Sequence, residues 1–240
     1  MIQHPISIVI PVYNEAEILQ KVILKLQKQL ATLTSNFEIL IIENGSSDES
    51  ARIGQQLSQS NKKIKYFHLE RPSYGAALRY GYLKSTKKII VNFSVDWIDL
   101  KFLNDAIAVL DKHSIVVASK MNSLSQDRRS LIRKIGGNIF HILTRILFDC
   151  PVSDTHGIKV IKKISTVPII KKCHYGSEIF DTELIIRAHQ KGLSITEIPI
   201  EVSELRAARS GIVKRAIKGV QQLLLLRYQM WLEMIFKKSE

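Results

Sequence analysis

The sequence predicts a three-layer α/β domain built around a mainly parallel sheet. Short β-branched apolar runs recur along residues 1–120, segments with helical spacing of apolar residues separate them, and turn residues mark several of the joins. This alternation is typical of βαβ units, whose parallel strands are covered by helices on both faces. The chain has 240 residues, which is long enough for one large domain with a substantial core.

The strands of the sheet are expected where the apolar runs lie. These runs cover residues 6–12, 37–42, 64–68, 89–95 and 115–118. Apolar residues recur every three or four positions in the segments between them, which predicts helices over about residues 18–30, 48–57, 76–83 and 102–110. Asn14 is suited to cap the first of these helices, and Asn44-Gly45 marks the turn after the second strand.

The second half of the chain has a different pattern. Residues 128–148 begin with basic side chains and continue with apolar ones at helical spacing, which predicts an amphipathic helix. A second amphipathic pattern starts at residue 212 and predicts a helical tail. We therefore expect a catalytic domain over residues 1–211 and a C-terminal helical tail over residues 212–240.

Composition and missing motifs exclude several classes of protein. The chain carries 35 Lys and Arg residues against 22 acidic ones, a net charge of +13 that favours anionic partners such as phosphorylated molecules or lipid. Two cysteines, with no Cys-x-x-Cys pair, exclude a disulfide scaffold and favour a cytoplasmic protein. No signal peptide or membrane span is expected. Motifs of dehydrogenases, P-loop NTPases, esterases and zinc proteases are absent, as are those of nucleic-acid-binding modules.

Acidic and amide side chains follow three of the predicted strands. Glu15 follows the first, Glu43 and Asn44 the second, and Asp96 and Asp99 the fourth. Open α/β sheets bind ligands at the carboxyl ends of their strands. Oxygen ligands there can bind ribose hydroxyls or hold a hard divalent cation beside a diphosphate. Each residue alone also suits a helix cap or turn, but their recurrence favours a binding site.

Seven motifs occur in a characteristic order between Ser7 and Arg209. They are SIVIPVYNEAE, EILIIENGSSDES, YGAALRYG, SVDWIDL, SDTHGIK, IFDTELIIRA and EIPIEV. Together they resemble the family 2 inverting glycosyltransferases, most closely the branch of polyprenyl-phosphate (dolichyl-phosphate) mannose and glucose synthases. The resemblance implies the nucleotide-diphospho-sugar transferase (GT-A) fold, a UDP- or GDP-sugar donor, and Mg²⁺ or Mn²⁺ as cofactor.

The resemblance also implies roles for individual residues. The catalytic set is Asp154, Asp181 and Glu183, and the metal ligand is Asp96, with Asp99 and His156 as candidate helpers. The donor-binding set is Pro11, Tyr13, Glu15, Glu43, Asn44, Ser46, Gly75, Arg79, Asp96, Arg206 and Arg209.

This sequence departs from the family pattern at three positions. Glu43 and Asn44 stand where the family usually has two aspartates, and Ser94 replaces the first Asp of the Asp-x-Asp metal motif. Because a serine hydroxyl is a poor metal ligand, Asp96 is left as the one firm carboxylate. A degenerate, non-catalytic homologue is therefore an alternative to an active transferase.

The acceptor is open between two chemical classes. A polyprenyl phosphate is already anionic, so it needs cations rather than a base, and Lys120, Arg128, Arg129 and Arg133 have the charge to bind it. A sugar hydroxyl, in glycan or cell-envelope assembly, needs a general base, for which Asp181 is the candidate. With the lipid acceptor, the apolar helical face of residues 135–148 is expected to dock on the cytoplasmic surface of a membrane. The oligomeric state is open.

Overall fold

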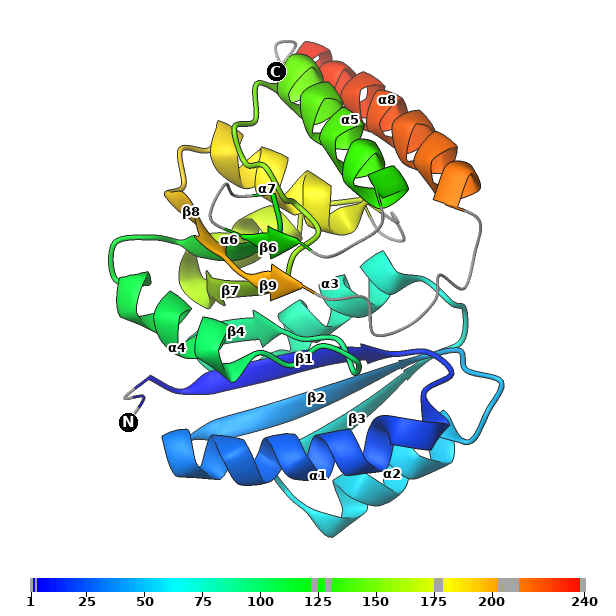
Figure 1. Cartoon of the computed structure of the whole chain (residues 1–240), viewed down its shortest axis with the longest axis vertical. Helices are drawn as coiled ribbons and strands as arrows, with labels where there is room; N and C mark the ends of the chain where they lie inside the picture. The colour runs from blue at the N-terminus through cyan, green and yellow to red at the C-terminus, as the bar shows by residue number, and fades with distance from the viewer. Residues whose placement is uncertain are drawn as a thin grey trace.

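The structure, a computed structural model, describes residues 2, 4–121, 125–127, 131–174, 179–202 and 212–237. Its centre is a seven-stranded sheet in the order β3-β2-β1-β4-β7-β5-β8 (Figure 1). Strand β7 runs antiparallel to its two neighbours, and the other pairs are parallel. The bounds are β1 Ile6–Val12, β2 Phe37–Asn44, β3 Ile64–Leu69, β4 Ile89–Asn92, β5 Ile115–Ser119, β7 Lys159–Lys162 and β8 Ile195–Pro199.

Helices cover both faces of the sheet, which confirms the predicted three layers. One face packs against α1 (Ala16–Leu33), α2 (Ser50–Ser60) and α4 (Leu100–Val109). The other packs against α3 (Tyr74–Lys84), α6 (Lys163–Ile170) and α7 (Phe180–Gln190). Two further helices, α5 (Leu131–Phe148) and α8 (Ile212–Lys237), lie side by side above this second layer, and β6 (Gln126–Asp127) pairs with β9 (Glu201–Val202).

The strands are apolar throughout because both of their faces are buried. In β1, Ile8 and Ile10 join the cluster beneath α1, whereas Val9 joins the cluster beneath α3. A continuous apolar run, rather than strict alternation, is the pattern of such a doubly covered strand. The run FEILII of β2 follows the same rule, which is why the strand predictions in the first half of the chain are confirmed.

Two local predictions were wrong. The strand predicted over residues 89–95 ends at Asn92, because Ser94 and Trp97 pair across a tight turn that carries the next residues out of the sheet. Asn14 does not cap α1: it adopts a left-handed φ of 53°, and its side chain accepts a hydrogen bond from the Ser47 amide. The Asp48 carboxylate accepts from the Ala16 amide (3.0 Å) and serves that helix end instead.

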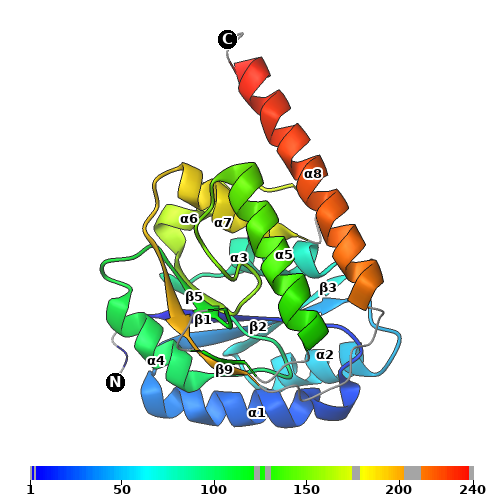
Figure 2. The same cartoon turned by 45° about the horizontal axis from the view of Figure 1, so that its top comes forward.

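The C-terminal helix α8 is docked on the body of the domain. Leu223, Leu226 and Met230 are buried in the cluster beneath α7. Arg187 of α7 adds two hydrogen bonds to the Glu233 carboxylate, at 2.8 and 2.7 Å. Beyond this contact the end of α8 extends past the rest of the molecule (Figure 2). No helix in the described part of the chain combines the length and hydropathy that a bilayer span requires.

A buried carboxylate in β2 makes stability depend on pH. Glu38 is almost fully buried and accepts hydrogen bonds from Ser7 and Thr86, with the Lys65 ammonium at 2.6 Å. Burial raises its pKa, but Lys65, Ser7 and Thr86 together outweigh burial and hold the pKa below its ordinary value of 4.5. Because the folded-state pKa is lowered, the stabilisation is present above the unfolded-state pKa and is lost as pH falls through the folded-state value.

We expect Glu38→Gln to lower the free energy of unfolding by about 2 kcal/mol at pH 7, because a charged hydrogen-bond acceptor is lost. The difference from the parent protein should shrink steadily as pH falls below about 4.5. Urea denaturation from pH 7 to pH 3 measures it. A difference that stays constant over that range contradicts the assignment.

Candidate active site

The carboxyl ends of the parallel strands meet at one edge of the sheet. The parallel register of β1 with β2 and β4, and of β5 with β8, brings the loops after these strands to this rim. Because β7 is antiparallel, its first residue, Lys159, lies at the same rim. The rim therefore gathers the predicted strand-end motifs, as expected for an open α/β sheet.

Hydrogen bonds between side chains and backbone tie together the two loops after β1 and β2. The Asn14 amide donates to the Ser46 hydroxyl (3.0 Å), and the Ser47 amide donates to the Asn14 carbonyl oxygen Oδ1 (2.8 Å). Tyr13 stands on this tied pair of loops with 42% of its surface exposed, next to half-buried Pro11. A fixed, exposed aromatic ring at the rim can pack against a nucleoside base.

Glu43 and Asn44, the residues that replace the usual aspartates, hold the rim backbone. Glu43 is fully buried; one oxygen accepts from the Ser46 amide (2.6 Å) and the other contacts His68 Nδ1. Asn44 accepts from the amide of Ser73, the residue that caps α3 (2.8 Å). Sequence reasoning missed His68, although it ends a predicted strand and lies opposite Glu43 in the parallel register.

Asp96 is exposed at the rim, and the Ser94 hydroxyl hydrogen-bonds its Oδ1. Asp99 is occupied as the N-cap of α4, where it accepts from the Phe102 amide (2.8 Å). Among the described residues no group of three or more His, Cys, Asp or Glu side chains could hold a metal ion. One carboxylate with a neighbouring hydroxyl does fit Mg²⁺ that is bound mainly through diphosphate oxygens and water.

Tyr74 lies within electrostatic reach of Asp96 and Asp181, and sequence reasoning did not single it out. Desolvation of its hydroxyl and the negative charges of Asp181 and Asp96 raise the pKa of Tyr74 well above its usual range, against a smaller opposing effect of Asn92. The phenol is therefore neutral at pH 7. Its place at the start of the YGAALRYG motif was the signal that could have revealed it.

Asp181 and Lys159 form an ion pair beneath the rim. Asp181 is 2% exposed and Lys159 is fully buried, and their Oδ1 and Nζ atoms are 2.9 Å apart. Lys159 Nζ also donates to the Gly157 carbonyl (2.7 Å). The second oxygen of Asp181 and the buried Tyr82 hydroxyl have no hydrogen-bond partner among the described residues. Asp181 is thus held by a cation and shielded from bulk water.

Asp154 is fixed by its neighbours. It accepts from the backbone amides of Lys120 and His156, both at 3.1 Å, and its carboxylate lies 3.2 Å from Lys120 Nζ. Burial raises its pKa, but Lys120 and these hydrogen bonds outweigh burial and lower the pKa below the usual range, so Asp154 is ionised. Only glycine can occupy position 157 in this loop, because the Cβ of any other residue would lie 1.9 Å from the Ala118 carbonyl oxygen. Lys120, predicted to bind the acceptor phosphate, thus lies at the rim in contact with Asp154.

The His156 ring lies edge-on against Phe140 of α5, with ring centroids 5.0 Å apart. Desolvation by the protein around it lowers the pKa of His156, outweighing the raising effect of Asp181 and Asp154. The imidazole is therefore neutral at pH 7, the form in which histidine accepts a hydrogen bond or binds a metal.

Three other predicted site residues make contacts that hold the fold together. Glu183 is fully buried and accepts from the His174 amide and ring and from Arg187 Nε (2.8 Å). Arg79 donates to the carbonyls of residues 170 and 171, where α6 ends, at 3.3 Å each. Gly75 is buried in α3. Arg128, Arg129, Arg206 and Arg209 lie outside the described residues, as does the side chain of Arg133.

The rim therefore offers an exposed aromatic residue, the exposed carboxylate of Asp96 and a buried ion pair at the ends of the strands. Fold and site together define an α/β enzyme of the nucleotide-diphospho-sugar transferase (GT-A) type. The chain belongs to glycosyltransferase family 2, because the family model "Glycosyl transferase family 2" matches residues 7–158, more than half of its length.

Curated relatives and solved structures agree with this assignment. A dolichyl-phosphate beta-glucosyltransferase of Trichomonas vaginalis is 27% identical over 94% of this chain and 75% of the relative. The dolichyl-phosphate beta-glucosyltransferase of Saccharomyces cerevisiae is 26% identical over 92% of this chain and 74% of the relative. Glucosyl-3-phosphoglycerate synthase from Mycobacterium tuberculosis, solved with Mn²⁺, UDP-glucose and phosphoglyceric acid, shares the fold with a TM-score of 0.67 at 15% identity, over 94% of this chain and 80% of that one.

Proposed function

We propose that this enzyme transfers a hexose from a nucleotide-diphosphate sugar to a polyprenyl phosphate at the cytoplasmic surface of a membrane, with inversion. The names of the relatives make glucose the first sugar to test, and UDP the first base, since the fold neighbour was solved with UDP-glucose. The observation that carries the proposal is the contrast between exposed Asp96 and Asp181, which is buried against Lys159. A rim at which the candidate base, Asp181, is buried against a lysine suits an acceptor that needs no deprotonation.

The rim can support an in-line displacement at the anomeric carbon. The bond from the acceptor phosphate oxygen to C1 forms as the bond from C1 to the nucleoside diphosphate breaks, and the leaving group takes the electron pair. Asp96, with Ser94, would hold Mg²⁺ or Mn²⁺, whose chemistry is to neutralise the diphosphate charge. Tyr13 and Pro11 lie where a nucleoside can pack, while Glu43, Asn44 and Ser46 keep that loop in place. Arg206 and Arg209 are proposed to bind the diphosphate, and Lys120, Arg128, Arg129 and Arg133 the acceptor phosphate.

A transfer assay tests donor and acceptor together. With UDP-[¹⁴C]glucose, Mg²⁺ and polyprenyl phosphate, we expect label in an organic-extractable, acid-labile product. GDP-mannose and a reaction without lipid serve as controls. Label that stays in unreacted donor across a panel of nucleotide sugars contradicts the proposal and favours a degenerate homologue.

The competing proposal is a transferase to a sugar hydroxyl in glycan or cell-envelope assembly, for which Asp181 is the candidate base. Asp181→Asn separates the two routes, because a hydroxyl acceptor needs the base and a phosphate acceptor does not. Because Asp181→Asn also leaves the Lys159 ammonium without its counter-charge, circular dichroism must show that the variant is folded at the assay temperature. Loss of most turnover in the folded variant favours the hydroxyl route.

The paired helices α5 and α8 offer the surface for membrane contact. Large apolar side chains on both helices are more than 40% exposed: Leu131, Ile132, Ile135, Ile139, Ile142, Ile146, Ile217, Leu224, Leu225, Tyr228, Trp231, Met234, Ile235 and Phe236. Helix α5 has no acidic residue, and Glu233, the one acidic residue of α8, is bonded to Arg187. We propose that this apolar face, with Lys134, Arg145, Lys218 and Arg227 beside it, docks on anionic lipid.

We expect the protein to co-sediment with phosphatidylglycerol vesicles more strongly than with phosphatidylcholine vesicles, and less strongly as salt rises. Ile139→Asp combined with Trp231→Asp should weaken this binding by at least about tenfold, since two apolar anchors become charged. Leu24→Asp, on α1 at the opposite end of the molecule, is the matched control. Equal binding by the parent and the double variant contradicts the docking face.

A further inference from the structure

A cavity lies at the edge of the sheet opposite the rim. It has a volume of about 680 Å³, within the range of small-molecule sites. His4 precedes β1, Lys88 precedes β4, and Lys162 and Lys163 lie where β7 ends and α6 begins. Because β1 and β4 are parallel, residues that precede them lie at the edge away from Tyr13 and Asp96. The cavity is therefore separate from the active site.

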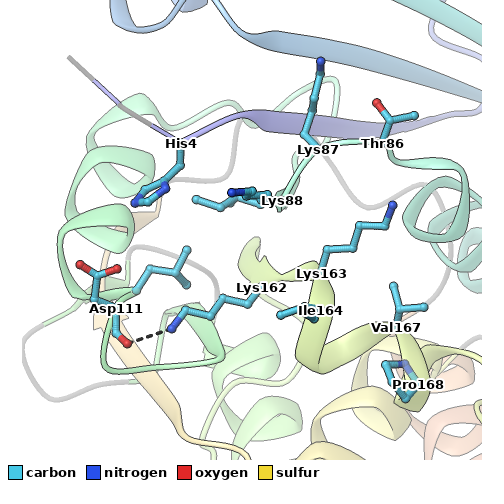
Figure 3. A pocket seen from close by; sticks show the side chains of 12 residues that line it. His4, Thr86, Lys87, Lys88, Asp111, Lys162, Lys163, Ile164, Val167 and Pro168 are labelled. Carbon is cyan, nitrogen blue, oxygen red and sulfur yellow. Dashed lines mark hydrogen bonds between the residues drawn. The ribbon is translucent and has the colours of Figure 1, made fainter.

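Apolar side chains form much of the wall of this cavity. They are Ile89, Leu110, Ile164, Val167 and Pro168 (Figure 3). Ile164 is 89% exposed, the largest value among the exposed large hydrophobic residues that the structure describes. Ile164, Val167 and Pro168 line the cavity together, and contiguous apolar surface of this kind is typical of a ligand-binding groove.

Lysine side chains surround the same cavity. Lys88, Lys162 and Lys163 lie around it, whereas the ammonium of Lys87 points away from them (Figure 3). Lys162 Nζ donates to the Asp111 carbonyl (2.8 Å) and Lys163 Nζ to the Ser85 carbonyl (2.5 Å). Carbonyl oxygens satisfy these donors but carry no net charge, and no ion pair to a carboxylate is found for these lysines within the described residues. Asp111 is the one acidic residue of the lining, so the lysines leave an excess of positive charge at the cavity.

The start of α6 adds to this positive potential. Its N-cap residue, Lys162, makes no side-chain capping bond, and α6 carries no acidic residue in its first turn. The first backbone amides of a helix have no partner inside the helix and carry partial positive charge. The first amide of α6, that of Lys163, donates to the Lys88 carbonyl (2.9 Å), and lysines rather than acidic residues stand at this end of the helix.

We propose that this cavity binds a small amphiphile with a phosphate head and an apolar body. The apolar wall calls for a ligand with an apolar part, because inorganic phosphate alone cannot cover Ile164 and Val167. The excess of lysines over the single acidic residue requires an anionic head, because a neutral molecule leaves that charge uncompensated. The site does not depend on the proposed transfer reaction.

Methyl NMR on the full chain, labelled at Ile and Val methyl groups, tests the site. UDP and Mg²⁺ at saturating concentration keep the rim occupied, and dodecyl phosphate is added below its micelle concentration. We expect saturable shifts at Ile89, Ile164 and Val167. Inorganic phosphate and the neutral amphiphile dodecyl maltoside should bind at least about tenfold more weakly, which corresponds to about 1.4 kcal/mol. Absence of shifts at these methyl groups, or equal binding of the neutral amphiphile, overturns the proposal.

Variants assign the binding to named side chains. Lys88→Ala combined with Lys163→Ala should weaken dodecyl phosphate binding by about tenfold, a loss of about 1.4 kcal/mol. Lys101→Ala removes a lysine that is 88% exposed on α4 and should leave binding unchanged. Ile164→Ser should reduce the preference for dodecyl phosphate over inorganic phosphate. Unchanged binding in the double lysine variant contradicts the site.

A vesicle titration identifies the source of the ligand. Shifts at the same methyl groups with phosphatidylglycerol vesicles point to a lipid headgroup, and shifts with monomeric dodecyl phosphate alone point to a soluble phosphate. Both results support the cavity as the site. Loss of glucosyl transfer in the assay above leaves this binding unaffected, so the two proposals fail independently.

Discussion

Asp96→Ala is expected to lower kcat by about 10²- to 10³-fold, because it removes the exposed carboxylate placed to organise charge on the departing diphosphate. Asp96 is exposed at the rim, and its described hydrogen-bond partner is the Ser94 hydroxyl, so its removal should not disturb folding. Steady-state rates at saturating donor, measured with and without Mn²⁺, give the result. The Mn²⁺ dependence should disappear together with the rate.

Two matched variants sharpen this prediction. Asp99→Ala, in the same loop, removes the N-cap of α4 and should cost about 1 kcal/mol of stability while turnover is retained. Ser94→Asp supplies a second carboxylate and should tighten Mn²⁺ binding. If Asp96→Ala keeps turnover within about tenfold of the parent, the diphosphate does not bind at Asp96 and the prediction is wrong.

Lys159→Met is expected to cost about 3–5 kcal/mol of folding stability, because it leaves Asp181 as an uncompensated charge in the interior. Both residues are buried, and Asp181 Oδ2 has no other partner among the described residues. Guanidinium denaturation measures the loss. The double variant Lys159→Met with Asp181→Leu should recover most of it, since apolar side chains of similar size often replace a buried ion pair at little cost.

Lys101→Met provides the comparison for that experiment. Lys101 pairs with Asp105 at 3.2 Å on the surface of α4, where such pairs contribute about 0–1 kcal/mol. If both lysine variants lose the same small free energy of unfolding, then the Lys159–Asp181 pair is solvated in solution. Asp181 would then be accessible to act as the general base for a hydroxyl acceptor.

Much of the fold and the location of the site could be predicted from the sequence. The runs at β1 and β2 are apolar at every position because both faces of the sheet are covered, so their composition alone reveals buried strands. Parallel strands place their carboxyl ends together, which is why residues as distant as Tyr13 and Asp96 could be assigned to one rim before their positions were known. The short strands β7 and β8 were missed, because neither carries a comparably long apolar run.

The partners of the polar residues could not be predicted in the same way. Glu43 and His68, 25 residues apart, meet because β2 and β3 pair in that register. Glu183 looked like a catalytic carboxylate, yet it joins Arg187, which reaches Glu233, 46 residues away on α8. Because burying an unpaired charge is costly, a buried charged side chain needs a partner. The sequence does not identify that partner, since many chain geometries could supply one.

Periodicity and strand-end chemistry in the sequence by themselves determined the layered α/β class and the rim that carries the candidate site, and the order of seven motifs determined the family resemblance. Only the tertiary structure decided that Asp181 pairs with Lys159, that α8 docks through Arg187 and Glu233, and that lysines gather around a cavity at the opposite edge of the sheet. The physical reason is that hydrophobic burial repeats along the chain with a period that can be read locally, whereas the pairing of charges depends on contacts between distant segments that form only in the folded protein.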